Sequence, residues 1–316
     1  MILVFSPKPI LERVALVERF QPGPGPQKPM RVGTYAGGVG FRAATVARLL
    51  DGDVLGVGFV GGQLGSLLRD CLDRQDVPHL LTPMQAGTHG SFLLLDKEQG
   101  IISDVPEPTP PHTPAEAEAL LKTLNRHLPG ASLLLAADDG QNEEADTALF
   151  REAFAAARKR DVPILVDGTG AALEAALDGG AWLLRLGLRT LQRRTERSMQ
   201  HDSAIITEAQ SFQEKSIRNV VITLGDEGAI LVAENGAWRV KPPVVSHFNP
   251  TGSGAALSGA LAARWVQDGN LLEAVRYGCA AASVNVTYDE PGYATAGEVK
   301  ILLRQTIAEP ITQRGT

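Results

Sequence analysis

Short apolar runs alternate with longer amphipathic segments along most of the chain. The apolar runs predict β-strands at residues 2–5, 54–60, 133–136, 164–166, 182–185 and 220–224. Apolar residues spaced three and four positions apart predict helices at 43–50, 65–75, 114–128, 146–160 and from 254 onward. Because strands that alternate with helices form βαβ units, this order predicts an α/β fold built around a mainly parallel sheet.

Four further extended segments interrupt this order. They cover residues 14–20, 31–35, 91–95 and 101–105. A stretch rich in Pro and Gly separates the first two and a polar turn separates the others, so they predict two strand pairs. An isolated hairpin is marginally stable in water. We therefore expect the pairs to form a small β lid, within segments at about 11–35 and 88–106 of a single domain that spans 1–316.

Composition and charge narrow the classes of function. The chain has 316 residues, of which 44% are hydrophobic and 21% charged, as in ordinary soluble proteins. Thirty basic against thirty-six acidic residues give a net charge of −6, which speaks against a broad nucleic-acid surface. No apolar stretch approaches the ~20 residues of a membrane-spanning helix. We expect neither nucleic acid nor membrane as a partner.

Cysteine and histidine give little support for a metal or disulfide framework. Cys71 and Cys279 lie far apart, and neither belongs to a CxxC motif. The first residues predict a strand and not a signal peptide, so a reducing cytoplasm is the expected location. The six histidines form no metal-binding pair. His89 and His247 remain open to either ligand contact or packing.

A late glycine-rich segment is the strongest functional signal. Residues 249–254 read Asn-Pro-Thr-Gly-Ser-Gly, and they end an extended stretch and begin a helix of small residues. Glycines let backbone N–H groups converge at a helix start, where the helix dipole adds positive charge. This geometry predicts an anion site, typically for phosphate. Residues 35–44 also lead into a helix, and residues 223–229 form a glycine turn between strands.

Residues 56–61 match the GxGxxG pattern of dinucleotide-binding sites, with Asp76 at a suitable distance. In such a site the helix begins inside the glycine run, whereas here apolar strand residues continue through it. A buried strand whose glycines allow close packing is the favoured interpretation. A dinucleotide-dependent oxidoreductase is the alternative.

In this order, the four glycine-containing segments resemble those of the PfkB carbohydrate kinases of the ribokinase-like superfamily. The similarity is strongest to the 1-phosphofructokinase and tagatose-6-phosphate kinase branch and runs to about residue 292. It implies a ribokinase-like αβα sandwich with a β lid that pairs two subunits as a homodimer. Active members transfer the γ-phosphoryl group of ATP, with Mg²⁺, to a hydroxyl of a sugar phosphate.

The resemblance also implies roles for individual residues. The nucleotide-side residues are Thr223, Gly225, Gly228, Asn249 and Thr251, and the backbone anion hole is formed by Gly252, Ser253 and Gly254. The residues on the substrate side are Glu12, Gly37, Gly38, Arg42 and Asp138. No residue is assigned to a metal.

The catalytic position departs from the family pattern. Family members carry an aspartate directly after the last glycine of the late motif, where it takes the proton of the attacking hydroxyl. This chain has Ala255 there. A methyl group accepts no proton, and general-base assistance contributes ~10²–10⁴ in rate. The anion hole consists of backbone donors and does not depend on that side chain.

Other positions also differ from the residues of the family pattern. Val39 and Arg42 stand where the early motif has Lys and Asn, and Glu12 replaces an N-terminal aspartate after a two-residue insertion. Asp138 and Asp139 place two carboxylates where a phosphorylated sugar would be repelled. The Lys-Pro-Asn motif of the family falls at residues 185–187, which read Arg-Leu-Gly.

Four arginines, at positions 185, 189, 193 and 197, recur at a spacing that stacks side chains on one face of a helix. They predict either a solvated face or a surface for an anion or acidic partner. Asp167 closes a strand and is expected either to cap the next helix or to belong to the site.

The leading hypothesis is a sugar-phosphate kinase homologue that binds ATP or a phosphosugar but has lost most phosphoryl transfer. The alternative within the family is an active kinase in which another carboxylate serves as the base. Asp138, Asp139 and Asp167 are the candidates.

Overall fold

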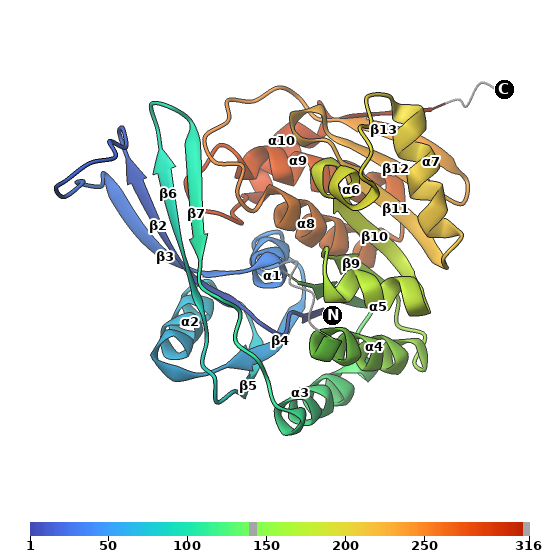
Figure 1. The fold of residues 1–316 in the computed structure, drawn as a ribbon. Coiled ribbons are helices and arrows are strands. Elements are labelled where there is room, and N and C mark those ends of the chain that lie inside the picture. Colours follow the sequence, from blue (N-terminus) through green and yellow to red (C-terminus); the bar gives the residue numbers. More distant parts are fainter. Residues whose placement is uncertain (139–143, 312–316) are drawn as a thin grey trace.

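A ten-stranded sheet runs through the centre of the computed structural model, which describes residues 1–138 and 144–311 (Figure 1). Seven adjacent strands are parallel, and three antiparallel strands extend one edge. In spatial order the strands are β14 (Ile307–Pro310), β13 (Gly236–Lys241), β12 (Ala229–Ala233), β11 (Ile217–Thr223), β10 (Ala181–Gly187), β9 (Ile164–Asp167), β8 (Leu133–Ala137), β1 (Ile2–Phe5), β4 (Val54–Val60) and β5 (His79–Pro83).

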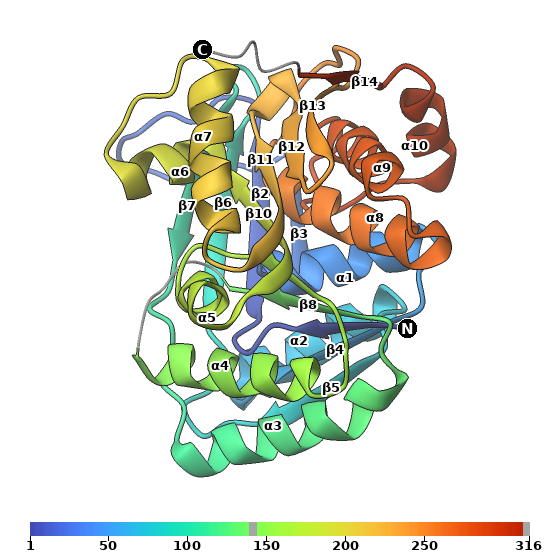
Figure 2. The same ribbon diagram turned by 90° about the vertical axis from the view of Figure 1, so that its right-hand side faces the viewer.

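Helices cover both faces of this sheet (Figure 2). One face carries α1 (Val39–Leu49), α2 (Gly62–Arg74), α8 (Ser253–Asp268) and α9 (Leu271–Asn285), with α10 (Ala296–Leu303) packed on α9. The other carries α3 (Pro114–His127), α4 (Glu144–Arg158), α5 (Ala171–Gly179), α6 (Leu188–Thr195) and α7 (Asp202–Gln213).

The central strand β1 shows why helices cover both faces of the sheet. Its Leu3 and Phe5 pack into the core on one side, while Ile2 and Val4 pack into the core on the other. All four side chains are buried, as expected for a parallel strand with helices on both faces. The predicted αβα sandwich around a mainly parallel sheet is confirmed.

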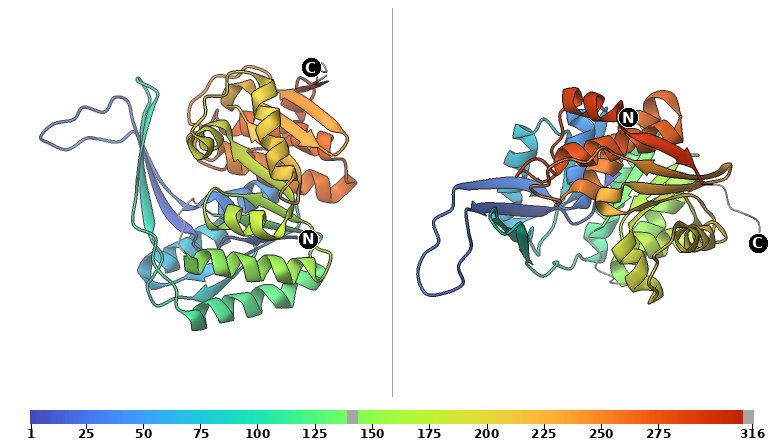
Figure 3. Two further views of the ribbon diagram at one scale, coloured as in Figure 1. Left: turned by 45° about the vertical axis from the view of Figure 1, so that its right-hand side comes forward. Right: turned by 90° about the horizontal axis from the view of Figure 1, so that it is seen from above.

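The four extended segments outside the main sheet form a second sheet, which projects from the body of the molecule (Figure 3). Its strands are β3 (Arg31–Gly37), β2 (Ile10–Val17), β6 (Gly90–Asp96) and β7 (Ile101–Pro106), in this order. The strand predicted at 14–20 begins earlier, because residues from Ile10 onward already pair with β3.

One face of this four-stranded sheet carries a small buried cluster, and the other carries several exposed apolar side chains. Val14, Leu93 and Leu95 form a small buried cluster on the packed face. On the opposite face, which we call the outer face, Phe92 lies between Arg13 and Val105 in the strand register. Val32, Phe92, Ile101 and Val105 are 44–64% exposed there.

The GxGxxG segment is part of a strand and not a phosphate loop. Gly56 and Gly58 lie within β4, and α2 begins only after the strand has ended. A side chain on Gly56 would overlap the ring of Phe41, and one on Gly58 would overlap the carbonyl oxygen of Ser6. The glycines therefore serve close packing, as favoured from the sequence, and the dinucleotide interpretation is wrong.

We expect Gly58→Ala to lower the free energy of unfolding by about 1–3 kcal/mol, because the added methyl group must displace backbone. Chemical denaturation measures this change. Gly130→Ala is the control, since an added methyl group there meets nothing within 4 Å. An unchanged stability of Gly58→Ala would contradict the packing account.

Candidate functional site

The candidate site lies where the parallel strands end. The carboxyl ends of β1, β8, β9, β10 and β11 lead to Ser6, Asp138, Gly168, Leu188 and Leu224 at one edge of the sheet. The helices α1, α5 and α8 begin at or near this edge and present backbone N–H groups. Ligands of α/β proteins bind at this edge, where helix N-termini favour anions.

The segment before α8 forms the predicted glycine turn at a helix start. Gly252 adopts a φ of 82°, and a side chain there would overlap the backbone nitrogen of Gly292. Asn249 is fully buried and holds the turn, because its side chain accepts a hydrogen bond from the Thr251 N–H at 2.9 Å. No side chain caps the N-terminus of α8. The Ser253 N–H donates to the Pro250 carbonyl at 3.1 Å, so the amides of Gly254 and Ala255 are the ones available to an external anion.

Ala255 lies in the first turn of α8 and is buried among apolar side chains of the core. The side chain that lies over the glycine turn is instead a cation. A Cβ on Gly254 would overlap the guanidinium group of Arg185. Arg185 reaches this position from β10.

Two residues hold Arg185 in place. Its Nη1 donates to Asp167 Oδ1 at 2.9 Å, and its Nη2 donates to Thr223 Oγ1 at 3.4 Å. Asp167 is buried at the end of β9, and its Oδ2 has no hydrogen-bond partner in the described part of the chain. The pair supplies both a cation and an unsatisfied carboxylate oxygen beside the turn.

A large cleft opens beside this cation. It encloses about 1450 Å³ of space, part of it open to solvent, between the β11–β12 turn, the segment 242–247 and the helices α8 and α9. Its lining includes the predicted residues Thr223, Gly225, Gly228, Ser253 and Gly254. His247 also lines it, whereas Asn249 and Thr251 shape the turn behind it. Burial raises the pKa of Cys279 in the cleft wall to about 12, so that thiol stays protonated.

The predicted substrate-side residues Glu12, Gly37, Gly38 and Arg42 come together at the start of α1. The buried Glu12 side chain pairs with the Arg42 guanidinium group, and Arg42 Nε lies 3.1 Å from Glu12 Oε2. Glu12 Oε1 also accepts the Gly38 N–H at 3.2 Å. A side chain on Gly37 would overlap Glu12. The chain's own carboxylate therefore occupies the N-terminus of α1.

Asp138 occupies the start of α5 in the same way. Its Oδ1 accepts the N–H groups of Thr169 and Gly170, and its Oδ2 accepts that of Ala172 at 2.6 Å. Asp138, and not Asp167, is thus the acid at this helix start, which corrects the expected cap. Its negative charge is compensated by these amides. Asp139 lies outside the described residues.

The four arginines do not share a helix face. Arg185 belongs to β10, Arg189 and Arg193 belong to α6, and Arg197 follows the end of that helix. Arg189, Arg193 and Arg197 are exposed, whereas Arg185 points into the cleft region. The stripe prediction is wrong because a strand ends at Gly187 and the i,i+4 spacing applies only within a helix.

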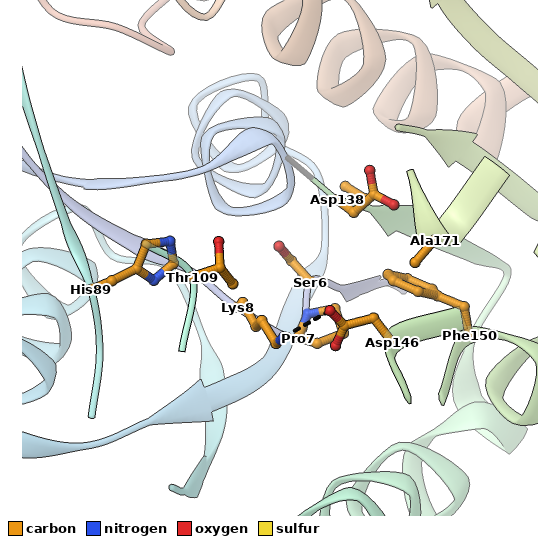
Figure 4. Close-up of a pocket in the computed structure, with 10 residues that line it drawn as sticks. Ser6, Pro7, Lys8, His89, Thr109, Asp138, Asp146, Phe150 and Ala171 are labelled. Carbon is orange, nitrogen blue, oxygen red and sulfur yellow. Dashed lines mark hydrogen bonds and ion pairs between the residues drawn. The ribbon is translucent and has the colours of Figure 1, made fainter. Parts of the chain in front are cut away.

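A polar cluster that the sequence did not indicate lies beside the end of β1 (Figure 4). Lys8 Nζ is 2.7 Å from Asp146 Oδ2, and both side chains are about nine-tenths buried. His112 Nδ1 lies 3.3 Å from Asp146 Oδ1 without forming a hydrogen bond to it, and the His112 ring stacks on Phe59. The one signal in the sequence was a lysine between two prolines directly after a buried strand.

Comparison with known proteins places the whole chain among related sequences. Residues 8–296 match the family described as "pfkB family carbohydrate kinase". A 1-phosphofructokinase of Escherichia coli strain K12 is 24% identical over 281 residues, which cover 88% of each chain.

Solved structures share the fold. Phosphofructokinase-2 from Escherichia coli, in a complex with potassium, aligns with a TM-score of 0.86 at 21% identity, covering 96% of this chain and 99% of that one. A possible 1-phosphofructokinase from Thermotoga maritima aligns with a TM-score of 0.87 at 18% identity, covering 99% and 100%.

Proposed function

The chain belongs to the PfkB family of carbohydrate kinases, and we propose that within this family it binds ATP but transfers the phosphoryl group to a carbohydrate only slowly. The observation that carries this proposal is Ala255 at the start of α8, where the family pattern has the proton acceptor. Binding is separable from turnover here because the anion site consists of backbone amides and Arg185.

Three features of the cleft support ATP as its ligand. The cleft is large enough for a nucleotide, and it contains the open N-terminus of α8. Arg185 adds a cation beside the same turn. A helix N-terminus together with a guanidinium group is a strong combination for phosphate oxygens.

The described residues contain no group of three or more acidic, His or Cys side chains that could hold a metal ion. Magnesium prefers to keep several water ligands and to bind nucleotide phosphates. We therefore propose that Mg²⁺ enters with ATP, held mainly by phosphate oxygens and water. Asp167, with its unsatisfied Oδ2, is the carboxylate nearest to Arg185 that could support it.

An active kinase with a substitute base remains the second candidate. Among the described candidates, Asp138 is engaged by three backbone amides and Asp167 by Arg185. The free oxygen of Asp167 is the observation that favours this alternative. Loose transition states make kinases tolerant of a weak base, because positioning and electrostatics carry much of the rate.

We also propose that two copies of the chain associate through the outer face of the four-stranded sheet. Its apolar side chains Val32, Phe92, Ile101 and Val105 are exposed on one face, and exposed apolar surface marks interaction sites. Tight packing of a second copy would remove this surface from water.

Location in the cytoplasm stays a prediction from the sequence. No described helix is long and apolar enough to cross a membrane.

We expect Ala255→Asp to raise phosphoryl transfer about 10²–10⁴-fold, because it restores a proton acceptor beside the anion site. Turnover with fructose 1-phosphate, fructose 6-phosphate, tagatose 6-phosphate and fructose measures the effect. Ala255→Asn is the matched control, since it adds similar volume without a base. A wild-type rate within the ~1–100 s⁻¹ of typical kinases would contradict the proposal and favour a substitute base.

We expect Arg185→Gln to weaken binding of a non-hydrolysable ATP analogue about 10–100-fold, because a charge-assisted hydrogen bond to phosphate contributes ~1.5–3 kcal/mol. Calorimetry measures the affinity, and thermal unfolding checks that the variant is folded. Arg185→Lys retains the charge and should bind better than Arg185→Gln. Arg189→Gln removes an exposed arginine and should bind as the wild type does; equal affinities in all variants would exclude Arg185 from the nucleotide site.

We expect the wild-type chain to sediment as a dimer and Phe92→Asp to sediment as a monomer, because a charge at the centre of the outer face disfavours its burial. Analytical ultracentrifugation distinguishes the two. Ile301→Asp is the control, since Ile301 is a similarly exposed apolar residue on α10, outside the four-stranded sheet. A monomeric wild type would exclude the proposed interface.

A further inference from the structure

A second, smaller cavity opens at the carboxyl edge of the sheet, beside the ends of β1 and β8 (Figure 4). It encloses about 400 Å³ of space, part of it open to solvent. Ser6, Pro7 and Lys8 follow β1, Asp138 follows β8, and Asp146 and Phe150 come from α4. The cavity does not share its lining residues with the nucleotide cleft.

The first anion-binding feature of this cavity is already occupied. Ala171, the first residue of α5, lies in its wall, so the N-terminus of that helix faces the cavity. The carboxylate of Asp138 accepts the amides at this helix start. An incoming phosphate would have to displace a charge that belongs to the chain.

The second anion-binding feature, the Lys8 ammonium group, is occupied as well. It is paired at 2.7 Å with Asp146, which is buried. Burial alone would raise the pKa of Asp146, but the nearby His112 ring and the hydrogen bond from Lys8 outweigh it and lower the pKa. Asp146 is therefore ionised at neutral pH and neutralises Lys8.

A further cation at this edge of the sheet is also paired with a buried acid. Arg42 at the start of α1 is paired with the buried Glu12, which also accepts an amide of that helix. The described lining residues of the cavity include two carboxylates, Asp138 and Asp146, and one ammonium group, Lys8. These residues therefore carry no surplus positive charge. Burying a phosphate dianion without such charge is strongly unfavourable.

The groups that remain are neutral hydrogen-bonding groups. Ser6, His89 and Thr109 line the cavity, and the described part of the chain offers their side chains no hydrogen-bond partner. Ser6 and His89 are more than nine-tenths buried. Burial lowers the pKa of His89, so its imidazole is neutral at pH 7 and both donates and accepts. Hydroxyl groups of a ligand match this set.

We propose that this cavity binds the hydroxyl-bearing, uncharged part of a carbohydrate, and that the acceptor of this chain is a neutral sugar or polyol rather than a sugar phosphate. That the bound carbohydrate is the phosphoryl acceptor rests on the proposed function. Lys8 and Asp146 determine the specificity, because their mutual pairing removes the charge that a phosphate ester would need.

The test is calorimetry on the full chain with D-fructose and D-sorbitol as neutral probes and fructose 6-phosphate and inorganic phosphate as anionic probes. The wild type should bind a neutral probe at least tenfold more tightly than either anion. Asp146→Asn leaves Lys8 unpaired and should gain at least tenfold affinity for fructose 6-phosphate. The double variant Asp146→Asn with Lys8→Met should lose that gain, and thermal unfolding confirms that each variant is folded.

Equal or tighter binding of fructose 6-phosphate by the wild type would overturn the inference. So would an Asp146→Asn variant that is folded but gains no affinity for the anion, or a wild type that binds none of the four probes. Binding of the ATP analogue is measured in the same samples. Retained nucleotide affinity would show that the inference has failed while the nucleotide part of the proposed function stands.

Discussion

The pairing of buried charges at the carboxyl edge of the sheet is the constraint on which the rest of the site depends. Lys8, Arg42 and Arg185 each reach this edge, and each is held by a buried acid: Asp146, Glu12 and Asp167. An unpaired charge in such surroundings is strongly destabilising, so each cation requires its partner. The pairs stabilise the edge, and in our proposal they also determine which ligand charges it accepts.

The helix N-termini at this edge differ in whether a side chain of the chain itself occupies them. The starts of α1 and α5 are occupied by Glu12 and Asp138, whereas no side chain caps the start of α8. In the proposed function, phosphate groups therefore bind on the α8 side, where Arg185 lies beside Gly254. A base at position 255 is not needed for this selectivity, since backbone amides and a guanidinium group provide it. Loss of the base and retention of a nucleotide site are physically compatible.

The sequence predicted the sheet, its main helices and the glycine turn well, because these follow from local apolar periodicity and from glycine's backbone freedom. It failed where a contact joins distant segments. Nothing local to residues 166–170 shows that Asp138 caps α5, and nothing local to Lys8 shows that Asp146 faces it. The arginine spacing misled for a related reason: helical periodicity was applied across the end of β10. A strand after the 223–229 turn was expected, but the ranges of β12, β13 and β14 were not predicted, since these antiparallel strands lie outside the βαβ alternation.

Glu12 belongs to β2 and thus to the four-stranded sheet, yet its carboxylate holds the start of α1 in the main body. In a strand, a slip of one residue exchanges the two faces, so it would carry Glu12 outward and turn Leu11 or Arg13 toward Arg42. The Glu12–Arg42 ion pair therefore opposes this misalignment. This ion pair holds the strand register of the projecting sheet where the sheet joins the body of the molecule. It does so whether or not another chain pairs with the edge strands of that sheet.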